Sequence, residues 1–281
     1  MNNKVLIVGL GLIGGSYAWK LKEMGYEVGA LTLNQEDIDY ALEHKMIDYG
    51  QVDVTKEYIS KFNFIIFCLY PTAFISWIKQ YCTYFSKGTI ITDVTGVKKS
   101  IVSEIQNILK SYDVEFIPSH PMAGKEVYGV KNASKDLFLK ANYLITPTSS
   151  NTEDAINFSK QLGIDLGFKN ISILSIEEHD EMIGFLSQLT HCIAISLMTC
   201  KDSEHLTKYT GDSFRDLTRI AKINENMWTE LFMLNKEELI SQMELFEENF
   251  KLLKDSIRND DQDKIKEMMK LSTLRRSRFD D

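Results

Sequence analysis

The stretch Gly9-Leu10-Gly11-Leu12-Ile13-Gly14 predicts how this chain folds. It follows Lys4–Val8, an apolar run rich in β-branched residues, which is typical of a strand buried on both faces of a parallel sheet. The next residues, Ile13–Met24, have helical character, and Gly25 stands where such a helix would end. A glycine-rich turn between a strand and a helix is typical of a dinucleotide-binding domain.

Each glycine of this turn has an expected task. Gly9 would permit the tight turn, Gly11 would let the backbone approach a pyrophosphate, and Gly14 would allow the helix to pack closely on the strand. Leu12 and Ile13 would open the helix, where free N–H groups and the positive end of the helix dipole favour phosphates. The alternative, a glycine-rich turn without a ligand, is disfavoured by this context.

The type of dinucleotide is less well specified. NAD-binding domains usually place Asp or Glu at the end of the second strand, about 20 residues further on, to bind the ribose hydroxyls. This chain has Leu31-Thr32-Leu33-Asn34 there, with neither a carboxylate nor an Arg for a 2′-phosphate. Thr32 and Asn34 could bind either form. We therefore expect NAD or NADP, with NAD slightly favoured.

Strand-like and helical segments continue to alternate up to about residue 174, which predicts a doubly wound α/β sheet. The expected strands are Glu27–Leu33, Phe64–Leu69, Thr89–Asp93, Glu115–Ile117 and Tyr143–Thr146, and the expected helices are Gln35–Lys45, Ala73–Phe85 and Lys99–Ser111. The fold class is therefore α/β, with a Rossmann-type dinucleotide-binding domain over residues 1–174.

The pattern changes after about residue 175. Ile176–Cys200 is apolar at helical spacing, and Leu217–Lys222 and Trp228–Asp255 also have helical character. The last proline is Pro147, and strand-like alternation ends. We expect an all-α second domain over residues 175–281, and the basic run Arg275-Arg276-Ser277-Arg278 near its end is expected to be a solvated helix end or tail.

Composition narrows the classes of function. The net charge of −8 argues against a nucleic-acid partner, which needs a basic face. The four cysteines form no C-x-x-C pair, so we expect no metal site. The apolar N-terminal stretch is short and broken by glycine, unlike a signal peptide, and we expect no membrane-spanning helix. These features predict a cytoplasmic protein.

The segment from Ser119 to Glu126 carries the candidate chemistry, with the sequence SHPMAGKE. It is expected just after a short strand, at the carboxyl edge of the sheet where ligands bind in open α/β folds. His120 there, beside a bound nicotinamide, could deprotonate a hydroxyl as hydride leaves its carbon. A buried structural histidine is the alternative.

With these motifs, the chain resembles the prephenate and arogenate dehydrogenase family. The resemblance is spread over blocks in family order, from residue 4 to about residue 255. The blocks are Gly9–Ser16, Thr92–Lys98, His120–Gly129, His179-Asp180, Leu186–His191, Phe214–Ala221 and Met227-Trp228. The resemblance implies oxidation and decarboxylation of prephenate on the route to tyrosine, in a homodimer joined through the helical domain.

The resemblance also implies catalytic roles. His120 would accept the proton of the ring 4-hydroxyl, and Glu126 would lie at the mouth of the site. The family usually has Ser at the position of Gly96, where its hydroxyl binds the histidine or the substrate. Glycine cannot do this, and the adjacent Thr95 is a candidate replacement.

Substrate-binding roles are implied in the same way. His191 and Arg219 would contact the substrate, with Arg219 holding a carboxylate through two parallel N–H bonds. Asp216 and Trp228 would line or support this pocket. The alternatives are a core role for His191, and for Arg219 an ordinary ion pair along its helix.

Three other functions stay open on the residues alone. Arogenate could replace prephenate as the substrate, since nothing in the sequence separates them. A β-hydroxyacid dehydrogenase also has a helical second domain, but is expected to use a Lys on that domain. A dinucleotide-sensing protein without catalysis is the third, with Gly96 as its best support.

Overall fold

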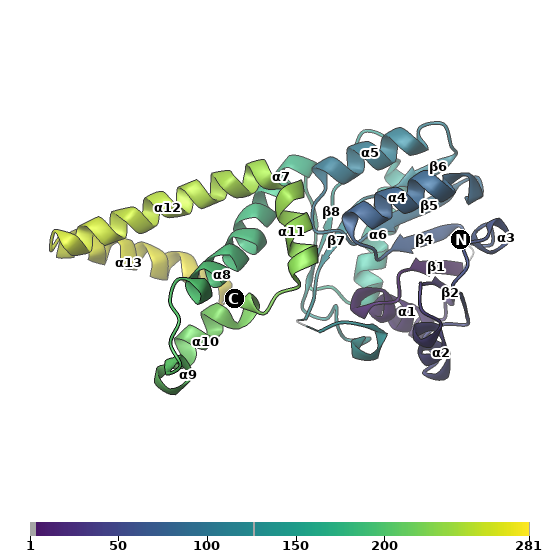
Figure 1. The fold of residues 1–281 in the computed structure, drawn as a ribbon. Coiled ribbons are helices and arrows are strands. Elements are labelled where there is room, and N and C mark those ends of the chain that lie inside the picture. The colour runs from purple at the N-terminus through teal and green to yellow at the C-terminus, as the bar shows by residue number, and fades with distance from the viewer. Residues whose placement is uncertain (1–3, 126, 281) are drawn as a thin grey trace.

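Two structurally different halves make up the chain in the computed structural model, which describes residues 4–125 and 127–280 (Figure 1). Strands and their covering helices form one half, and helices alone form the other. This is the α/β domain followed by an all-α domain that the sequence predicts.

The main sheet has six strands, all parallel, in the order β3-β2-β1-β4-β5-β6. Its strands are β1 (Lys4–Val8), β2 (Glu27–Leu31), β3 (Tyr49–Gln51), β4 (Phe64–Phe67), β5 (Thr89–Asp93) and β6 (Val114–Phe116). The strand order reverses direction between β1 and β4. Ligands of open α/β sheets bind at the carboxyl ends of the strands beside such a reversal.

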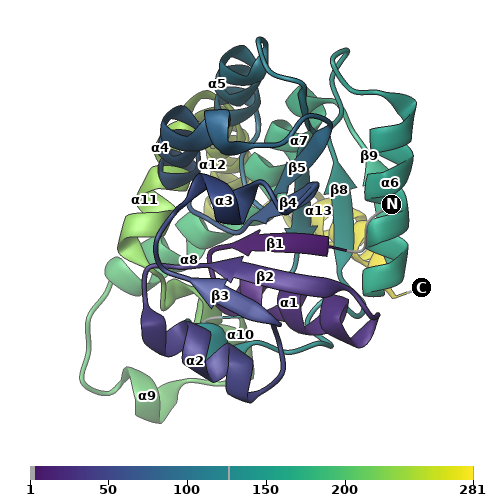
Figure 2. The same cartoon turned by 90° about the vertical axis from the view of Figure 1, so that its right-hand side faces the viewer.

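Helices cover both faces of this sheet (Figure 2). Val5 and Ile7 of β1 belong to one buried cluster, whereas Leu6 and Val8 belong to another. This two-sided burial explains why β1 is continuously apolar rather than alternating. The first cluster lies under α1 (Leu12–Glu23), α2 (Gln35–Glu43) and α6 (Glu153–Leu166), and the second under α3 (Lys56–Ile59), α4 (Pro71–Tyr81) and α5 (Lys99–Leu109).

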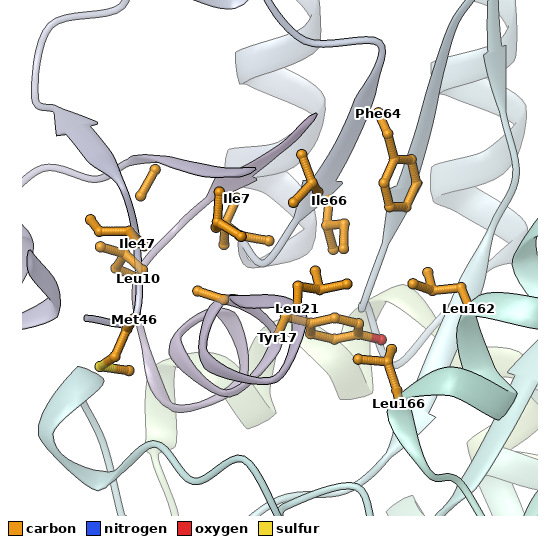
Figure 3. Close-up of a cluster of buried hydrophobic side chains, with 14 of the residues drawn as sticks. Ile7, Leu10, Tyr17, Leu21, Met46, Ile47, Phe64, Ile66, Leu162 and Leu166 are labelled. Atoms are coloured by element: carbon orange, nitrogen blue, oxygen red, sulfur yellow. The ribbon is translucent and has the colours of Figure 1, made fainter. Parts of the chain in front are cut away.

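Tyr17 is a large side chain of the first cluster and is 1% exposed. Figure 3 shows its ring between the strand residues Ile7 and Ile66 and Leu166 of α6. Tyr17 follows the glycine turn by one helical turn. Its burial therefore anchors the start of α1 against the sheet, and with it the backbone of the turn.

A second sheet carries the segment that contains His120. It has the order β7-β8-β9, with β7 (Ser119–Met122) antiparallel to β8 (Asn142–Ile145) and β8 parallel to β9 (Asn170–Ile173). The segment follows the short strand β6, as expected, but residues 119–122 are themselves a strand, which the sequence did not predict. Pro121 makes this strand hard to predict, because proline argues against a strand within a sheet and is accepted mainly in edge strands. Strand β7 is an edge strand.

The second half contains helices and short helical turns only, among the residues described. They are α7 (Ile176–Ile183), a π-helical turn (Gly184–Leu189), α8 (Thr190–Thr199), α9 (Leu206–Tyr209), α10 (Asp212–Thr218), a 3-10 turn (Arg219–Ala221), α11 (Glu225–Leu234), α12 (Lys236–Arg258) and α13 (Gln262–Arg276). Helices α12 and α13 form a hairpin that extends away from the sheets (Figure 1). A 3-10 turn (Ser277–Phe279) follows α13, so the expected solvated basic run is the exposed end of a helix.

The expected continuous helix over Trp228–Asp255 is interrupted at Asn235, between α11 and α12. Asn235 is buried, and its amide donates to the carbonyl of Asp180 at 2.9 Å and to the side-chain oxygen of Gln188 at 2.8 Å. Neither proline nor glycine marks this break. Tertiary hydrogen bonds to α7 and the π-helical turn stabilise it.

Ile176–Thr199 is one continuous helical stretch of 24 residues that is long and apolar enough, by length and composition only, to cross a membrane. The expectation that the protein has no membrane-spanning helix stays a prediction. Within it, His179, Asp180 and Gln188 are buried and hydrogen-bonded to other elements of the protein. These contacts bind the stretch to neighbouring elements, whereas only 28% of its 18-residue apolar window is buried.

The glycine turn generates the first prediction. A Cβ added at Gly14 would lie 1.9 Å from the backbone oxygen of Gly9, whereas a Cβ at Gly11 would have nothing within 4 Å. We expect Gly14→Ala to lower the free energy of unfolding by about 2–4 kcal/mol, because backbone must move. Gly11→Ala, the matched control, should cost less than about 1 kcal/mol. Thermal denaturation measures both, and equal melting temperatures for the two variants would contradict the predicted contact.

Candidate active site

The glycine turn leaves a cradle for an anion at the carboxyl end of β1. Gly9 has φ of +101°, a left-handed conformation that favours glycine, and Gly11 is the N-cap of α1. The N–H of Gly15 bonds the Gly11 carbonyl at 2.9 Å, so the N–H groups before it have no acceptor within the helix. The first turn of α1 carries no acidic residue. The space beside Gly11 and these donors fit a pyrophosphate, with Leu12 and Ile13 as the first helical donors.

The end of β2 places Thr32 and Asn34 at the same edge of the sheet. Leu33 between them is 93% exposed. The Asn34 amide donates to a carboxylate oxygen of Asp37 at 3.3 Å, in the first turn of α2. The acid of NAD-binding domains is expected directly after the strand, so the sequence did not point to Asp37. The first turn of α2 brings Asp37 close to Asn34 at this edge of the sheet.

His120 lies on β7, mostly buried, with its two ring nitrogens in different surroundings. Its Nδ1 is 3.0 Å from Nε2 of His179 on α7. On the other side, a Cβ placed on Gly96 would lie 3.8 Å from Nε2 and from Cε1 of His120, and 3.6 Å from Leu231 of α11. One ring edge is therefore covered by a histidine, and the other faces the Gly96 loop.

A buried ion pair holds the backbone beneath His120. The Lys98 ammonium lies 2.6 Å from Oδ2 of Asp93 at the end of β5, and both side chains are 0% exposed. The same ammonium donates to the carbonyl of Ser119 at 2.6 Å, and the N–H of Ser119 donates to Oδ1 of Asp93 at 3.1 Å. Burial lowers the pKa of Lys98, and the Asp93 carboxylate opposes that shift. The pair thus joins β5 to the residue before His120.

Thr95 belongs to this loop network. Its single hydroxyl proton has Asp93 and the Val97 carbonyl as acceptors within reach, and its oxygen accepts from Lys98 Nζ at 3.1 Å. The residue is 3% exposed. These bonds give Thr95 a structural task in the loop. They do not favour the hypothesis that Thr95 replaces the hydroxyl missing at Gly96.

Asp180 links α7 to the start of α5. Its Oδ1 accepts from the N–H of Lys98 at 2.9 Å and its Oδ2 from the N–H of Lys99 at 2.8 Å. Oδ1 also lies 2.7 Å from Nδ1 of His179. The sequence places His179-Asp180 in a family block but leaves the role of His179 undecided between site and structure. The contact with His120 could not be read from the spacing, since His120 and His179 are 59 residues apart.

Both histidines are held toward the neutral form. Burial lowers the pKa of His120 well below its usual value, and positive charge on His179 or Lys98 lowers it further. Burial also lowers the pKa of His179, although its bond to Asp180 opposes this shift. A neutral imidazole at position 120 can accept a proton at neutral pH.

His191 and Trp228 are brought together by the helical half. Their ring centroids are 3.6 Å apart with an interplanar angle of 30°, and Nδ1 of His191 lies 2.9 Å from the Ser187 carbonyl. Trp228 lies one turn before Leu231 on α11, so the two share a helix face. Since Leu231 borders Gly96, the ring pair lies toward the same side of α11 as the Gly96 loop.

Arg219 and Asp216 lie in elements that pack against α8, the helix that carries His191. Asp216 is in α10, and Arg219 begins the 3-10 turn that packs on α8, the helix of His191. Both residues are exposed in the single chain. The neighbouring Arg215 pairs with Asp212 at 3.2 Å. Glu126 lies outside the described residues, so its predicted place at the mouth of the site stays a prediction.

Among the described residues, the side chains that could bind a metal ion do not form a cluster. Within residues 4–125 and 127–280, no group of three or more His, Cys, Asp or Glu side chains could hold a metal ion. The chemistry available from the described residues is proton transfer at His120, together with a cradle for a dinucleotide.

Comparison with known proteins decides the family. The family model of the prephenate dehydrogenase nucleotide-binding domain matches residues 17–171, and that of the prephenate dehydrogenase dimerization domain matches residues 175–271. The chain belongs to the prephenate dehydrogenase family. It is therefore an oxidoreductase, and this family membership confirms the resemblance read from the sequence.

Individual members of the prephenate dehydrogenase family agree. The chain is 32% identical over 252 residues to a prephenate dehydrogenase of Lactococcus lactis subsp. cremoris, covering 88% of this chain and 69% of the relative. It is 26% identical to a cyclohexadienyl dehydrogenase of Zymomonas mobilis, covering 95% and 93%. A crystal structure of prephenate dehydrogenase from A. aeolicus, in complex with hydroxyphenyl propionate and NAD+, superposes with a TM-score of 0.89 at 29% identity, covering 98% of both chains.

The glycine at position 96 generates the second prediction. A Cβ there meets only ordinary contacts, the nearest at 3.6 Å, so Gly96→Ser should change the melting temperature by less than about 2 °C. Its hydroxyl would stand next to Nε2 of His120. We expect prephenate-dependent turnover to rise by about 2- to 10-fold, the value of one added hydrogen bond. The matched control is Gly96→Ala, which adds the carbon without the hydroxyl. Equal turnover of the two variants would refute a role for a hydroxyl here.

Proposed function

We propose that this chain catalyses the NAD(P)-dependent oxidative decarboxylation of prephenate to 4-hydroxyphenylpyruvate, on the route to tyrosine. The observation that carries the proposal is His120, a neutral imidazole with one edge covered by His179 and the other beside Gly96. Both domains of the chain match the family of that reaction.

The reaction requires no covalent bond between the protein and the substrate. A nicotinamide dinucleotide bound at Gly9, Gly11 and Gly14 supplies the acceptor for the hydride of the hydroxyl-bearing ring carbon. His120 takes the hydroxyl proton as that carbon becomes a carbonyl. The ring carboxylate then leaves as carbon dioxide, its bond electrons pass through the ring to the oxygen, and His120 returns the proton to give the phenol. Aromatisation makes the overall step irreversible.

Two carboxylates of prephenate need partners. We propose that the guanidinium of Arg219 binds one of them, because a guanidinium forms two parallel hydrogen bonds to a carboxylate. The stacked rings of His191 and Trp228 would border the same pocket, with Asp216 supporting it. Whether Arg219 serves its own site or that of a second subunit depends on the dimer.

We further propose that the chain forms a homodimer through its helical half. Helices α12 and α13 carry large exposed apolar side chains, and the second family model describes a dimerization domain. These side chains are Ile240, Leu245, Phe246, Phe250, Leu252, Ile257, Met269, Leu271 and Leu274. An exposed apolar surface of this kind marks an interaction site. A location in the cytoplasm stays a prediction.

The deciding experiment measures reduction of the dinucleotide by its ultraviolet absorbance, with the purified chain and prephenate. Formation of 4-hydroxyphenylpyruvate and carbon dioxide supports the proposal. Faster turnover of arogenate would reassign the substrate, and turnover of a simple 3-hydroxyacid would indicate a β-hydroxyacid dehydrogenase. Dinucleotide binding without turnover of any of these would overturn the enzymatic proposal.

The third prediction concerns His120. The amide of His120→Asn can occupy the place of Nδ1 and keep a bond to His179, but Nε2 is lost. We therefore expect a folded variant that binds the dinucleotide normally and loses at least about 10²-fold in turnover, the usual contribution of a general base. Steady-state kinetics and calorimetric titration of the dinucleotide measure the two effects. Wild-type turnover would remove His120 from the reaction.

The fourth prediction concerns the choice between NAD and NADP. Residues 32–35 include no cation to attract a 2′-phosphate, whereas Asp37 lies close to Asn34. We expect a preference for NAD within about tenfold, equivalent to about 1.4 kcal/mol. Thr32→Asp should increase it through ribose hydroxyl bonds and charge repulsion, and the neutral control Thr32→Asn should not.

The ratio of specificity constants for the two dinucleotides measures this preference. A native ratio above a hundredfold in either direction would show that another residue reaches the adenosine ribose.

A further inference from the structure

His120, His179 and Asp180 form a hydrogen-bonded series that crosses from one half of the protein to the other. His120 lies on β7 of the second sheet, whereas His179 and Asp180 lie in α7. The His120 Nδ1 to His179 Nε2 distance is 3.0 Å, and the His179 Nδ1 to Asp180 Oδ1 distance is 2.7 Å. His179 is 0% exposed and Asp180 1% exposed.

The direction of each bond follows from Asp180. Its two oxygens already accept from the backbone N–H groups of Lys98 and Lys99, at 2.9 and 2.8 Å. A carboxylate in this position only accepts hydrogen bonds, so Nδ1 of His179 must carry a proton and donate it. The start of α5, with the positive end of its dipole, further favours a negative Asp180.

The tautomer of His120 then follows as well. A neutral His179 that donates from Nδ1 has a lone pair on Nε2 and can only accept there. His120 must therefore donate from Nδ1, which leaves the lone pair on its own Nε2. That nitrogen is the one beside Gly96, on the open side of the ring.

We propose that His179 is a positioning residue that sets the tautomer of His120, with Asp180 setting that of His179. The inference rests on the proposed function for its kinetic consequence, but the tautomer itself is independent of the reaction. When Nε2 of His120 takes a proton, its bond to His179 becomes charge-assisted and stabilises the cation that forms. The carboxylate acts through one imidazole and does not touch His120.

The surrounding charges determine how pH affects the pair. His120 faces His179 and Lys98, whereas His179 faces Asp180, Lys98 and Asp93. The pKa of His120 is lowered first by burial and then by positive charge on His179 and Lys98. Activity should fall as the pH drops through this pKa, because a protonated Nε2 accepts nothing. A neutral His179 that accepts from Nδ1 stabilises the protonated His120 ring, so removing His179 should lower the pKa of His120, and the fall should begin at a lower pH.

Two substitutions at position 179 separate positioning from structure. The His179→Leu side chain cannot accept a hydrogen bond, whereas the side-chain oxygen of His179→Gln can stand where Nε2 stood. We expect His179→Leu to lose at least about tenfold in turnover and to shift the acid limb of its pH profile to lower pH. His179→Gln should lose less than about fivefold. Glu181→Gln, which changes an exposed residue of the same helix, should match wild type.

Nitrogen-15 NMR of histidine-labelled protein reads the tautomer directly, with the His120→Asn variant assigning the signal. A His120 signal with the proton on Nδ1 supports the proposal, and this measurement needs no substrate. The opposite tautomer in wild type, or an unchanged rate and pH profile in His179→Leu, would overturn it. If His179→Leu does not fold, the wild-type tautomer and the His179→Gln profile decide. Failure of wild type to oxidise prephenate would instead overturn the proposed function and leave the tautomer assignment standing.

Discussion

The buried pair of Lys98 and Asp93 is the interaction on which the geometry of the site depends. Neither side chain is exposed, and between them they bind both the N–H and the carbonyl of Ser119, the residue before His120. Removing one member of such a pair leaves a charge uncompensated in the interior, which typically costs about 3–5 kcal/mol. The pair therefore places the second sheet on the end of β5, where the catalytic candidate needs to be.

A second carboxylate, Asp180, does the equivalent work between the two halves of the protein. Its side chain accepts the first N–H groups of α5, and its backbone carbonyl accepts from Asn235 of the helical half. Helices α7, α5 and α11 thus meet at one residue. Because His179 precedes Asp180, the junction that joins the domains also supplies the partner of His120. Asp180 therefore contributes both to the association of the two halves and, through His179, to the orientation of the His120 ring.

Departures from the usual family pattern lie at the edge of this arrangement. Gly96 lacks the usual serine, and the bonds of Thr95 tie its hydroxyl to the loop instead. The end of β2 lacks the usual acid, although Asp37 reaches the same edge through Asn34. Each departure is a difference of side chain, and it lies beside a buried ion pair or a helix end that this chain has. The framework of buried ions and helix ends therefore tolerates variation at the residues that touch the ligand space.

Local sequence determined the glycine turn, the apolar parallel strands and the helical second half, because these depend on periodicity and turn chemistry read over a few residues. The family followed from the resemblance of sequence blocks spread along the chain. The sequence missed β7, where Pro121 disguises an edge strand, and the break at Asn235, which neither proline nor glycine marks. It named His120, His191, Arg219 and Trp228, but it could not show which atoms meet. The contacts of His120 with His179, and of Lys98 with Asp93 and Ser119, depend on how separate elements pack. Only the tertiary structure decides them, because a hydrogen bond between residues 59 positions apart leaves no pattern of spacing or periodicity in the sequence.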